Sequence, residues 1–306
     1  MKFLKEYPIP IAGLILSLFT LGNLLQSYSQ TLRLIIGVIG FIFYVIYVAK
    51  LLFENKTLKE EFKNPVIASV FLTFTMATML LAVYVKPFSS TVSYVVWYIG
   101  VVGHGFLILW FSAEFLLKFS IKKVFPSWYI VYVGIAVASV TAPAVQQLQA
   151  GKICFWIAFV GYFCILPLVC CRVWKIKEIP EAAQPTLIIL SAPASLLLAG
   201  YMNSFEQKNT IIVYLLLFFS VTFYVIALYH LPKLLKLKFT PGYSAFTFPL
   251  VISALATKLT GGYFKQKGID FTILIKIEEL IAFLIVGWVL VCYLVFLFKP
   301  DKKPEN

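Results

Sequence analysis

Charged residues are scarce in this chain of 306 residues, where Asp, Glu, Lys and Arg together make up 13%. A soluble domain carries about 25% charged residues, so this chain cannot cover a water-exposed surface of ordinary polarity. Hydrophobic residues, by contrast, make up 61% of the chain. The composition therefore predicts an integral membrane protein that keeps most of its length in lipid.

Cysteine and histidine are also few, and neither forms a metal-binding pattern. The five cysteines all lie in apolar stretches: Cys154, Cys164, Cys170, Cys171 and Cys292. Their number is odd and no C-x-x-C spacing occurs, which indicates neither a disulfide framework nor a metal site. His104 and His230 have no second ligand at metal-binding spacing, and we find no nucleophile–base pair, glycine-rich phosphate loop or nucleotide motif. We therefore expect no enzyme, no metal and no cofactor.

Acidic residues are outnumbered, with 13 Asp and Glu against 26 Lys and Arg and a formal net charge of +13. In a soluble protein this excess would suggest nucleic acid as a partner. Here the basic residues lie in short links between apolar runs, where they indicate topology and contacts with lipid headgroups. We expect membrane lipids as partners and no nucleic acid.

Long apolar runs are abundant. A membrane-spanning helix needs about 20 apolar residues, and ten runs of that kind follow one another. They cover residues 8–27, 32–53, 65–86, 91–117, 127–148, 152–174, 185–204, 209–230, 241–260 and 271–298. The chain is therefore predicted to be all-α, a single transmembrane domain over residues 1–306.

The distribution of Lys and Arg predicts the topology. Eight of the 26 lie on one side: Arg33, Lys86, Lys152, Lys208, Lys258, Lys265, Lys267 and Lys276. The other 18 lie at the N-terminus, in the links after the even-numbered spans and in the tail. By the positive-inside rule, both termini are cytoplasmic in a multi-pass protein of the cell membrane. Lys2 and Lys5 before an apolar run imitate a signal peptide, but no small-residue cleavage site follows, so we expect a retained first helix.

A proline repeat marks the odd-numbered spans. Each begins at or next to one proline of the set Pro10, Pro65, Pro126, Pro185 and Pro241, spaced by 55, 61, 59 and 56 residues. Proline suits the first turn of a helix, and a repeat of this length indicates an array of like units. We predict five helical hairpins in a quasi-fivefold ring around a central pore.

Helix-breaking and small polar residues gather in the odd-numbered spans. The most distinctive are Thr75, Thr141, Pro143, Ser191, Pro193, Thr247 and Pro249. A proline inside a helix frees a backbone carbonyl, which in a membrane needs a partner or a wet cavity. We therefore predict that the odd-numbered spans line the pore and bend at these prolines, with the even-numbered spans outside. The alternative, that small residues only permit close helix packing, stays open at each position.

The predicted pore lacks acidic residues. The five odd-numbered spans contain no Asp, Glu, His or Arg, and their only charged residues are Lys86 and Lys258 near the outer ends. Cation pores and proton-coupled pumps usually place carboxylates or histidines in the path. The pattern favours small anions or dicarboxylates, attracted by these two lysines. For Lys258 the alternative is a side chain that snorkels at a helix end.

Four motifs carry a resemblance to a known family. They are Tyr7-Pro8-Ile9-Pro10, Phe125-Pro126-Ser127-Trp128-Tyr129, Ala192-Pro193-Ala194 and Ser244-Ala245-Phe246-Thr247-Phe248-Pro249. With five hairpins, the chain resembles the tellurite-resistance/dicarboxylate transporter family, which includes TehA proteins, malate permeases and slow-type anion channels. The resemblance covers nearly the whole chain.

The resemblance implies a homotrimer of independent pores, each blocked by a phenylalanine of the ninth span. Phe248 matches that gate and Phe246 is the second candidate, while ordinary packing is the alternative for Phe248. The implied function is a membrane anion channel or channel-like transporter. The alternatives are a secondary carrier for C4-dicarboxylates such as malate, or an efflux protein for tellurite or other toxic compounds.

Polar residues of the even-numbered spans are interpreted as structural. We expect Glu114 to pair with Lys118 one helical turn away. We expect His104 to be a buried imidazole with satisfied hydrogen bonds, and His230 to cap the end of the eighth span. Glu278 and Glu279 would begin the tenth span, where they suit the positive end of the helix dipole or lipid headgroups.

Overall fold

A computed structural model describes residues 2–298, and every regular element within them is helical. The first half comprises α1 (Lys2–Glu6), α2 (Ile11–Leu25), α3 (Gln30–Phe53), α4 (Asn55–Glu61), α5 (Pro65–Phe71), α6 (Thr73–Val85), α7 (Ser90–Phe111), the π-helix η1 (Ser112–Leu116), the 3-10 helix η2 (Ile121–Lys123), α8 (Trp128–Val133), the 3-10 helix η3 (Gly134–Ala136) and α9 (Val137–Val145). The second half comprises α10 (Leu148–Cys170), the π-helix η4 (Cys171–Ile176), the 3-10 helix η5 (Glu181–Ser191), α11 (Ala192–Ser204), α12 (Thr210–Leu234), the 3-10 helix η6 (Pro241–Phe246), α13 (Thr247–Lys265) and α14 (Thr272–Leu297). The tail lysines used for the topology, Lys299, Lys302 and Lys303, lie outside the described residues.

Nine helical segments of the described chain are long and apolar enough to cross a membrane. They are Gln30–Phe53, Pro65–Val85, Ser90–Leu116, Trp128–Val145, Leu148–Ile176, Glu181–Ser204, Thr210–Leu234, Pro241–Lys265 and Thr272–Leu297. The tenth apolar helix, α2, has only 15 residues. At 1.5 Å per residue it is about 22 Å long, shorter than a hydrocarbon core of about 30 Å. The predicted all-helical, multi-pass architecture is confirmed, with nine spans of full length rather than ten.

Burial divides the spans into two sets. In Pro65–Val85, Trp128–Val145, Glu181–Ser204 and Pro241–Lys265, between 72 and 89% of the most apolar window is buried, whereas the other five spans bury 22–33%. Helix α2 belongs with the first set, since 14 of its 15 residues are buried. We call α2, α5–α6, α8–η3–α9, η5–α11 and η6–α13 the inner segments, and α3, α7, α10, α12 and α14 the outer helices.

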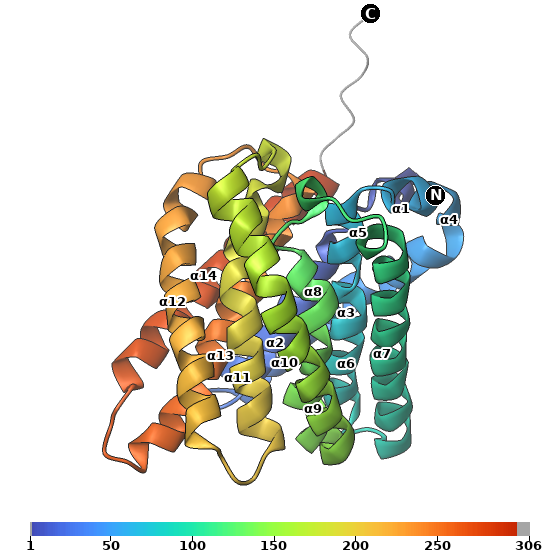
Figure 1. Ribbon diagram of the computed structural model, residues 1–306. Coiled ribbons are helices and arrows are strands. Elements are labelled where there is room, and N and C mark those ends of the chain that lie inside the picture. Colours follow the sequence, from blue (N-terminus) through green and yellow to red (C-terminus); the bar gives the residue numbers. More distant parts are fainter. Residues whose placement is uncertain (1, 299–306) are drawn as a thin grey trace, which may run out of the picture.

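The inner segments contact one another in sequence. Helix α2 packs on α6, α6 on α9, α9 on α11, α11 on α13, and α13 again on α2. Each also packs on the outer helix that follows it in the chain, as α6 does on α7 and α13 does on α14. The long helices run side by side, and α1, α4 and the start of α5 lie at one end of the bundle (top of Figure 1).

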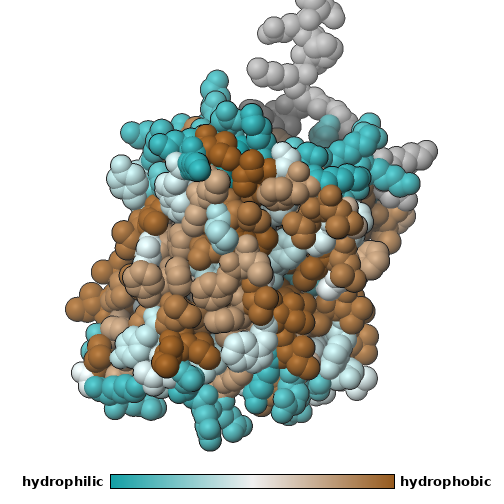
Figure 2. Space-filling model, viewed as in Figure 1, coloured by the Kyte–Doolittle hydropathy of each residue, from teal (hydrophilic) through white to brown (hydrophobic). Residues whose placement is uncertain are grey.

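The outer surface has the polarity of a membrane protein. On the face in view, Figure 2 shows a band of hydrophobic side chains between two hydrophilic ends. Large apolar side chains are exposed along the outer helices, for example Ile42 on α3, Phe106 on α7 and Phe218 on α12. Such a surface is stable only against lipid or another apolar surface, because exposing it to water carries a large free-energy cost.

The predicted end of the eighth span at His230 is wrong. Helix α12 continues through His230 and Pro232 to Leu234. Leu231 and Leu234 are buried, so their packing holds the last turn although Pro232 removes one backbone hydrogen bond. His230 therefore lies inside the helix and does not cap it.

Close packing of α7 on α6 depends on Gly100. A Cβ atom at Gly100 would lie 2.7 Å from Cγ of Met79 and 3.0 Å from the carbonyl oxygen of Thr75. On the same helix, a Cβ at Gly105 would meet no atom within 4 Å. We predict that Gly100→Ala destabilises the protein by about 1–3 kcal/mol through overpacking, while Gly105→Ala is neutral or slightly stabilising because alanine favours the helix. Melting temperatures in detergent measure both variants, and equal melting temperatures would contradict this account of the packing.

Candidate pore and gate

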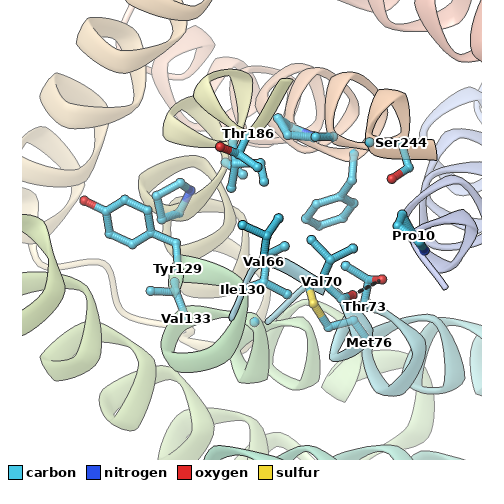
Figure 3. A pocket seen from close by; sticks show the side chains of 18 of the residues that line it. Pro10, Val66, Val70, Thr73, Met76, Tyr129, Ile130, Val133, Thr186 and Ser244 are labelled. Carbon is cyan, nitrogen blue, oxygen red and sulfur yellow. Dashed lines mark hydrogen bonds between the residues drawn. The ribbon is translucent and has the colours of Figure 1, made fainter. Parts of the chain in front are cut away.

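Residues of four inner segments, together with Pro10 directly before α2, line one small cavity of about 70 Å³, which we call the closed cavity. Its wall consists of Pro10, Val66, Ile67, Val70, Thr73, Met76, Tyr129, Ile130, Val133, Gly134, Ala182, Thr186, Ile189, Ala192, Pro193, Leu196, Gly242, Ser244, Ala245, Phe248 and Pro249. Figure 3 shows Val66, Val70, Met76 and Ile130 on this wall, with Pro10 and Thr186 from other segments. The wall is almost entirely apolar.

The closed cavity lies where each inner segment changes its backbone geometry. Helix α2 starts after Pro10, α5 gives way to α6 at Leu72, α8 to η3 at Gly134, η5 to α11 at Ala192, and η6 to α13 at Thr247. The cavity-lining residues that border these changes are Pro10, Val70 and Thr73, Val133 and Gly134, Ile189 and Ala192, and Ala245 and Phe248. A 3-10 segment within a helix often marks strain or a hinge, and three of these five junctions contain one: η3, η5 and η6.

Pro193 and Pro249 lie at these changes rather than inside long α-helices, as the sequence had suggested. Pro193 is the second residue of α11 and Pro249 the third residue of α13, each directly after a 3-10 segment. The first four N–H groups of an α-helix have no partner within the helix. Proline is tolerated near the start of an α-helix, and here each proline follows directly on a change from 3-10 to α-helix.

Hydroxyl groups satisfy the carbonyls next to the two prolines. Ser195 donates to the carbonyl of Ser191 at 2.7 Å, and Ser253 donates to that of Pro249 at 2.8 Å. The Ser195 and Ser253 hydroxyl oxygens lie 3.1 Å apart, and Ser195 also contacts Ser220 of α12 at 2.7 Å. This buried network joins α11, α12 and α13. Ser191 acts through its carbonyl and does not line the cavity.

His104 is a buried imidazole between two inner segments, as predicted. Its Nδ1 lies 2.7 Å from Oγ1 of Thr75 and its Nε2 lies 3.1 Å from the carbonyl of Val131. Thr75 Oγ1 is also within 2.8 Å of the carbonyl of Leu72, the residue between α5 and α6. The two ring nitrogens of His104 therefore contact Thr75 and Val131, which lie three residues from the changes of helix geometry at Leu72 and Gly134. Thr75 thus has a structural position.

Thr247 and Thr141 are satisfied by neighbouring helices. The Ser17 hydroxyl donates to Thr247 Oγ1 at 2.6 Å, and Thr247 donates to the carbonyl of Ser244 at 2.7 Å, which ties α13 to α2. The indole of Trp97 donates to Thr141 Oγ1 at 2.8 Å, which ties α7 to α9. Neither threonine belongs to the cavity wall.

The hydroxyls on the cavity wall offer few free donors. Thr73 donates to the carbonyl of Val70 at 2.7 Å, and Thr186 donates to that of Ala183 at 2.6 Å. The buried hydroxyl of Tyr129 has no hydrogen-bond partner among the described residues, and in Figure 3 it points away from the centre of the cavity. An apolar cavity with so few donors gives an anion little to replace its hydration shell, as in hydrophobic constrictions that close by dewetting.

A wider recess, which we call the vestibule, has a volume of about 700 Å³ and adjoins the closed cavity. The two share Pro10, Val66, Ile67, Ala182 and Gly242. Charged residues on the vestibule wall are Lys5, Glu6, Lys50, Glu61, Lys122 and Lys123. The vestibule is thus a recess with a net basic wall that adjoins an apolar constriction.

Phe248, Phe246 and Pro143, which the sequence suggested for the pore, lie in three different environments. Phe248 lies on the wall of the closed cavity, buried beside Pro249. Phe246 is fully buried, packs on Tyr243 with ring centroids 4.9 Å apart, and does not line the cavity. Pro143 lies near the end of α9 and is exposed next to Gln146 and Gln147.

The structure places Lys258 in an ion pair and corrects the position predicted for the two glutamates of the tenth span. Lys258 Nζ lies 2.6 Å from Glu279 Oε1 and donates to the carbonyl of Leu24 at 2.9 Å, so a carboxylate faces its charge. Helix α14 begins at Thr272, and Glu278 and Glu279 are buried in its second turn, not at its start or at lipid headgroups. They were misplaced because the helix begins six residues before Glu278, and the partly exposed Lys258 supplies the counter-charge to Glu279.

The same ion pair extends to the loop after α2. Tyr28 donates to Glu279 Oε2 at 2.6 Å, and this hydrogen bond raises the pKa of Tyr28. Lys258 Nζ also lies 4.9 Å from the centroid of the Tyr28 ring. The cluster joins α2, α13 and α14 at the end of the bundle away from the vestibule.

Two other charged residues named from the sequence lie away from the closed cavity. Lys86 is the C-cap residue of α6 and does not line the cavity. Glu114 pairs with Lys118 at 3.2 Å, as predicted.

Most of the cavity wall was not predicted. Val66, Val70, Met76, Ile130 and Thr186 line the cavity, but their types do not distinguish them from ordinary core residues. The available signal was position, because each lies within about three turns of the repeated proline that begins its segment. That signal gives a stretch of chain and not the side chains that face inward.

Comparison with known proteins identifies the family. A family model described as voltage-dependent anion channel matches residues 7–297. The match spans nearly the whole chain, so the chain belongs to this family, and the resemblance inferred from its motifs is confirmed. The family is one of membrane anion channels rather than enzymes. No curated protein matches the chain.

We predict that Lys258→Met destabilises the protein by about 3 kcal/mol, because it leaves the buried carboxylate of Glu279 without a cation. The double variant Lys258→Met, Glu279→Leu should recover most of that loss, since both charges are then removed. Melting temperatures of the two variants in detergent measure the effect. A double variant as unstable as the single one would show that the ion pair is not the reason.

Proposed function

We propose that this member of the voltage-dependent anion channel family conducts small anions through a path enclosed by its five inner segments. The observation that carries the proposal is that the start of α2 and four changes of helix geometry in the other inner segments border one cavity. The successive contacts of α2, α6, α9, α11 and α13 support a closed ring around that path. Irregular backbone at membrane depth is tolerated where it is buried in protein or lines a cavity.

The charge of the path supports anions as the transported species. None of the five odd-numbered spans predicted from the sequence contains an acidic residue. Lys258 is paired with Glu279. The vestibule wall carries four lysines and two glutamates. A path with a basic approach and no carboxylate along its length concentrates anions and leaves cations without a binding site.

We assign the gate to Phe248. Its ring lies on the wall of the closed cavity, two residues after the change from η6 to α13. A side chain at such a change can move by a small rotation of the backbone or by a change of rotamer. Phe246, the second candidate, packs on Tyr243 and does not line the cavity, which favours Phe248 as the gate.

The vestibule is assigned to the cytoplasmic side. The starts of the inner segments and the loops with Lys122 and Lys123 line it, and these belong to the side with the excess of Lys and Arg. Both termini are then cytoplasmic. The homotrimer expected from the family resemblance is consistent with the large apolar surface of the outer helices.

We predict that Phe248→Ala raises anion current strongly, at least tenfold, because the apolar constriction then widens enough to hold water and a partly hydrated ion. Currents are measured in planar bilayers with chloride, nitrate and malate gradients. Phe246→Ala is the matched control and should change the current little. Unchanged current in Phe248→Ala would refute the gate, and saturable, proton-dependent malate uptake without current would instead indicate a dicarboxylate carrier.

A further inference from the structure

Arg172 is a buried arginine with unused hydrogen-bonding capacity. It lies in η4, at the end of α10, with 2% of its surface exposed. Its Nη2 donates to the backbone carbonyl of Glu178. Its Nε and Nη1 are buried and have no hydrogen-bond partner among the described residues. Buried donors are nearly always paired, so two unpaired nitrogens on one guanidinium call for an acceptor.

The charge of Arg172 is also uncompensated within the described part of the chain. Arginine is rarely buried without a carboxylate partner, because desolvating its charge is costly. The carboxylate of Glu178 would be the natural partner, but it pairs with Lys122 at 3.1 Å. The remaining contact of the guanidinium is with the ring of Phe125, 5.4 Å from its carbon Cζ to the ring centroid. Among the residues that the structure describes, Arg172 therefore has two neutral partners and no anionic one.

The guanidinium lies directly behind the vestibule wall. Phe125, on whose ring it packs, lines the vestibule together with Lys122 and Lys123. Pro180 and Ala182, which follow Glu178 in the chain, line the same recess. A turn of the Phe125 ring would connect the unpaired nitrogens of Arg172 to a volume of about 700 Å³.

We propose that Arg172 is an oxyanion-binding site at the vestibule, in which oxygen atoms of the anion accept hydrogen bonds from Nε and Nη1. A guanidinium suits planar or tetrahedral oxyanions such as nitrate and phosphate because its charge is delocalised over several directed donors. Lys123, exposed on the same wall, supplies a second positive charge. The role as the first stop of a transported anion rests on the proposed function, whereas the binding itself does not.

The binding test uses purified protein in detergent and requires no current. Melting temperatures are measured in nitrate, phosphate and chloride at equal ionic strength. A ligand that binds only the folded protein stabilises it by mass action, so the native protein should gain a few degrees in nitrate or phosphate relative to chloride. Arg172→Gln should lose this gain and Arg172→Lys should keep part of it. No oxyanion-dependent gain in the native protein would overturn the proposal.

Arg33 provides the matched control. It is also buried over an aromatic ring, 4.5 Å from the Tyr84 centroid, but its Nε is bonded to Asn23 at 2.9 Å and it does not line the vestibule. Arg33→Gln should lower the melting temperature in every salt and leave the oxyanion-dependent gain intact. Loss of the gain in both arginine variants would show a general loss of stability and would overturn the proposed site.

Two further measurements separate the possible sources of the oxyanion. If phosphatidylglycerol in phosphatidylcholine vesicles stabilises the native protein but not Arg172→Gln, and free phosphate does not, the site takes a lipid headgroup. If nitrate and phosphate suffice, the site takes free anions. In that case Arg172→Gln should halve the nitrate current, or reduce it further, at low salt. If the nitrate current of Arg172→Gln is unchanged, the site has no role in transport, but the binding site stands. If the native protein carries no current at all, the proposed function is refuted, but the binding site again stands.

Discussion

The need to satisfy every backbone polar group away from water is the constraint on which the whole structure depends. In lipid, an unpaired carbonyl or N–H costs several kcal/mol, so the chain crosses as helices and can break them only where partners exist. Here the 3-10 breaks within spans occur in the inner segments, whose full-length spans have 72–89% of their most apolar window buried. Ser195, Ser253 and Thr247 supply the hydroxyls that hold the backbone next to Ser191, Pro249 and Ser244.

That constraint also separates the fixed and the adjustable parts of the molecule. The outer helices are regular over most of their length and expose apolar side chains, as a contact with lipid requires. The inner segments are 3-10 on one side of the closed cavity and α-helical on the other in η5–α11 and η6–α13. A small change at such a junction moves side chains such as Phe248 without unpairing the rest of the helix, which is the property that a steric gate needs.

The sequence predicted the spans because apolar runs and the proline period follow directly from the membrane constraint. It also predicted the Glu114–Lys118 pair from the spacing of one helical turn, and the buried state of His104 from the lack of a second metal ligand at suitable spacing. It could not predict which side chains face inward, because the switch from 3-10 to α-helix rotates every later residue. Nor could it predict that Lys258 pairs with Glu279, 21 residues away on another helix. The end of α12 was misjudged because packing of Leu231 and Leu234 overrides the local effect of Pro232.

The central claim is that the closed cavity lies on the path of the anion. Thr186→Cys places a thiol on its wall, and the additional variant Phe248→Ala is expected to hold the path open. A negatively charged methanethiosulfonate reagent applied from the vestibule side should then abolish most of the anion current, whereas Phe248→Ala alone, with the five native cysteines, should keep its current. Persistent current after complete modification of the introduced cysteine would place the anion path elsewhere in the protein.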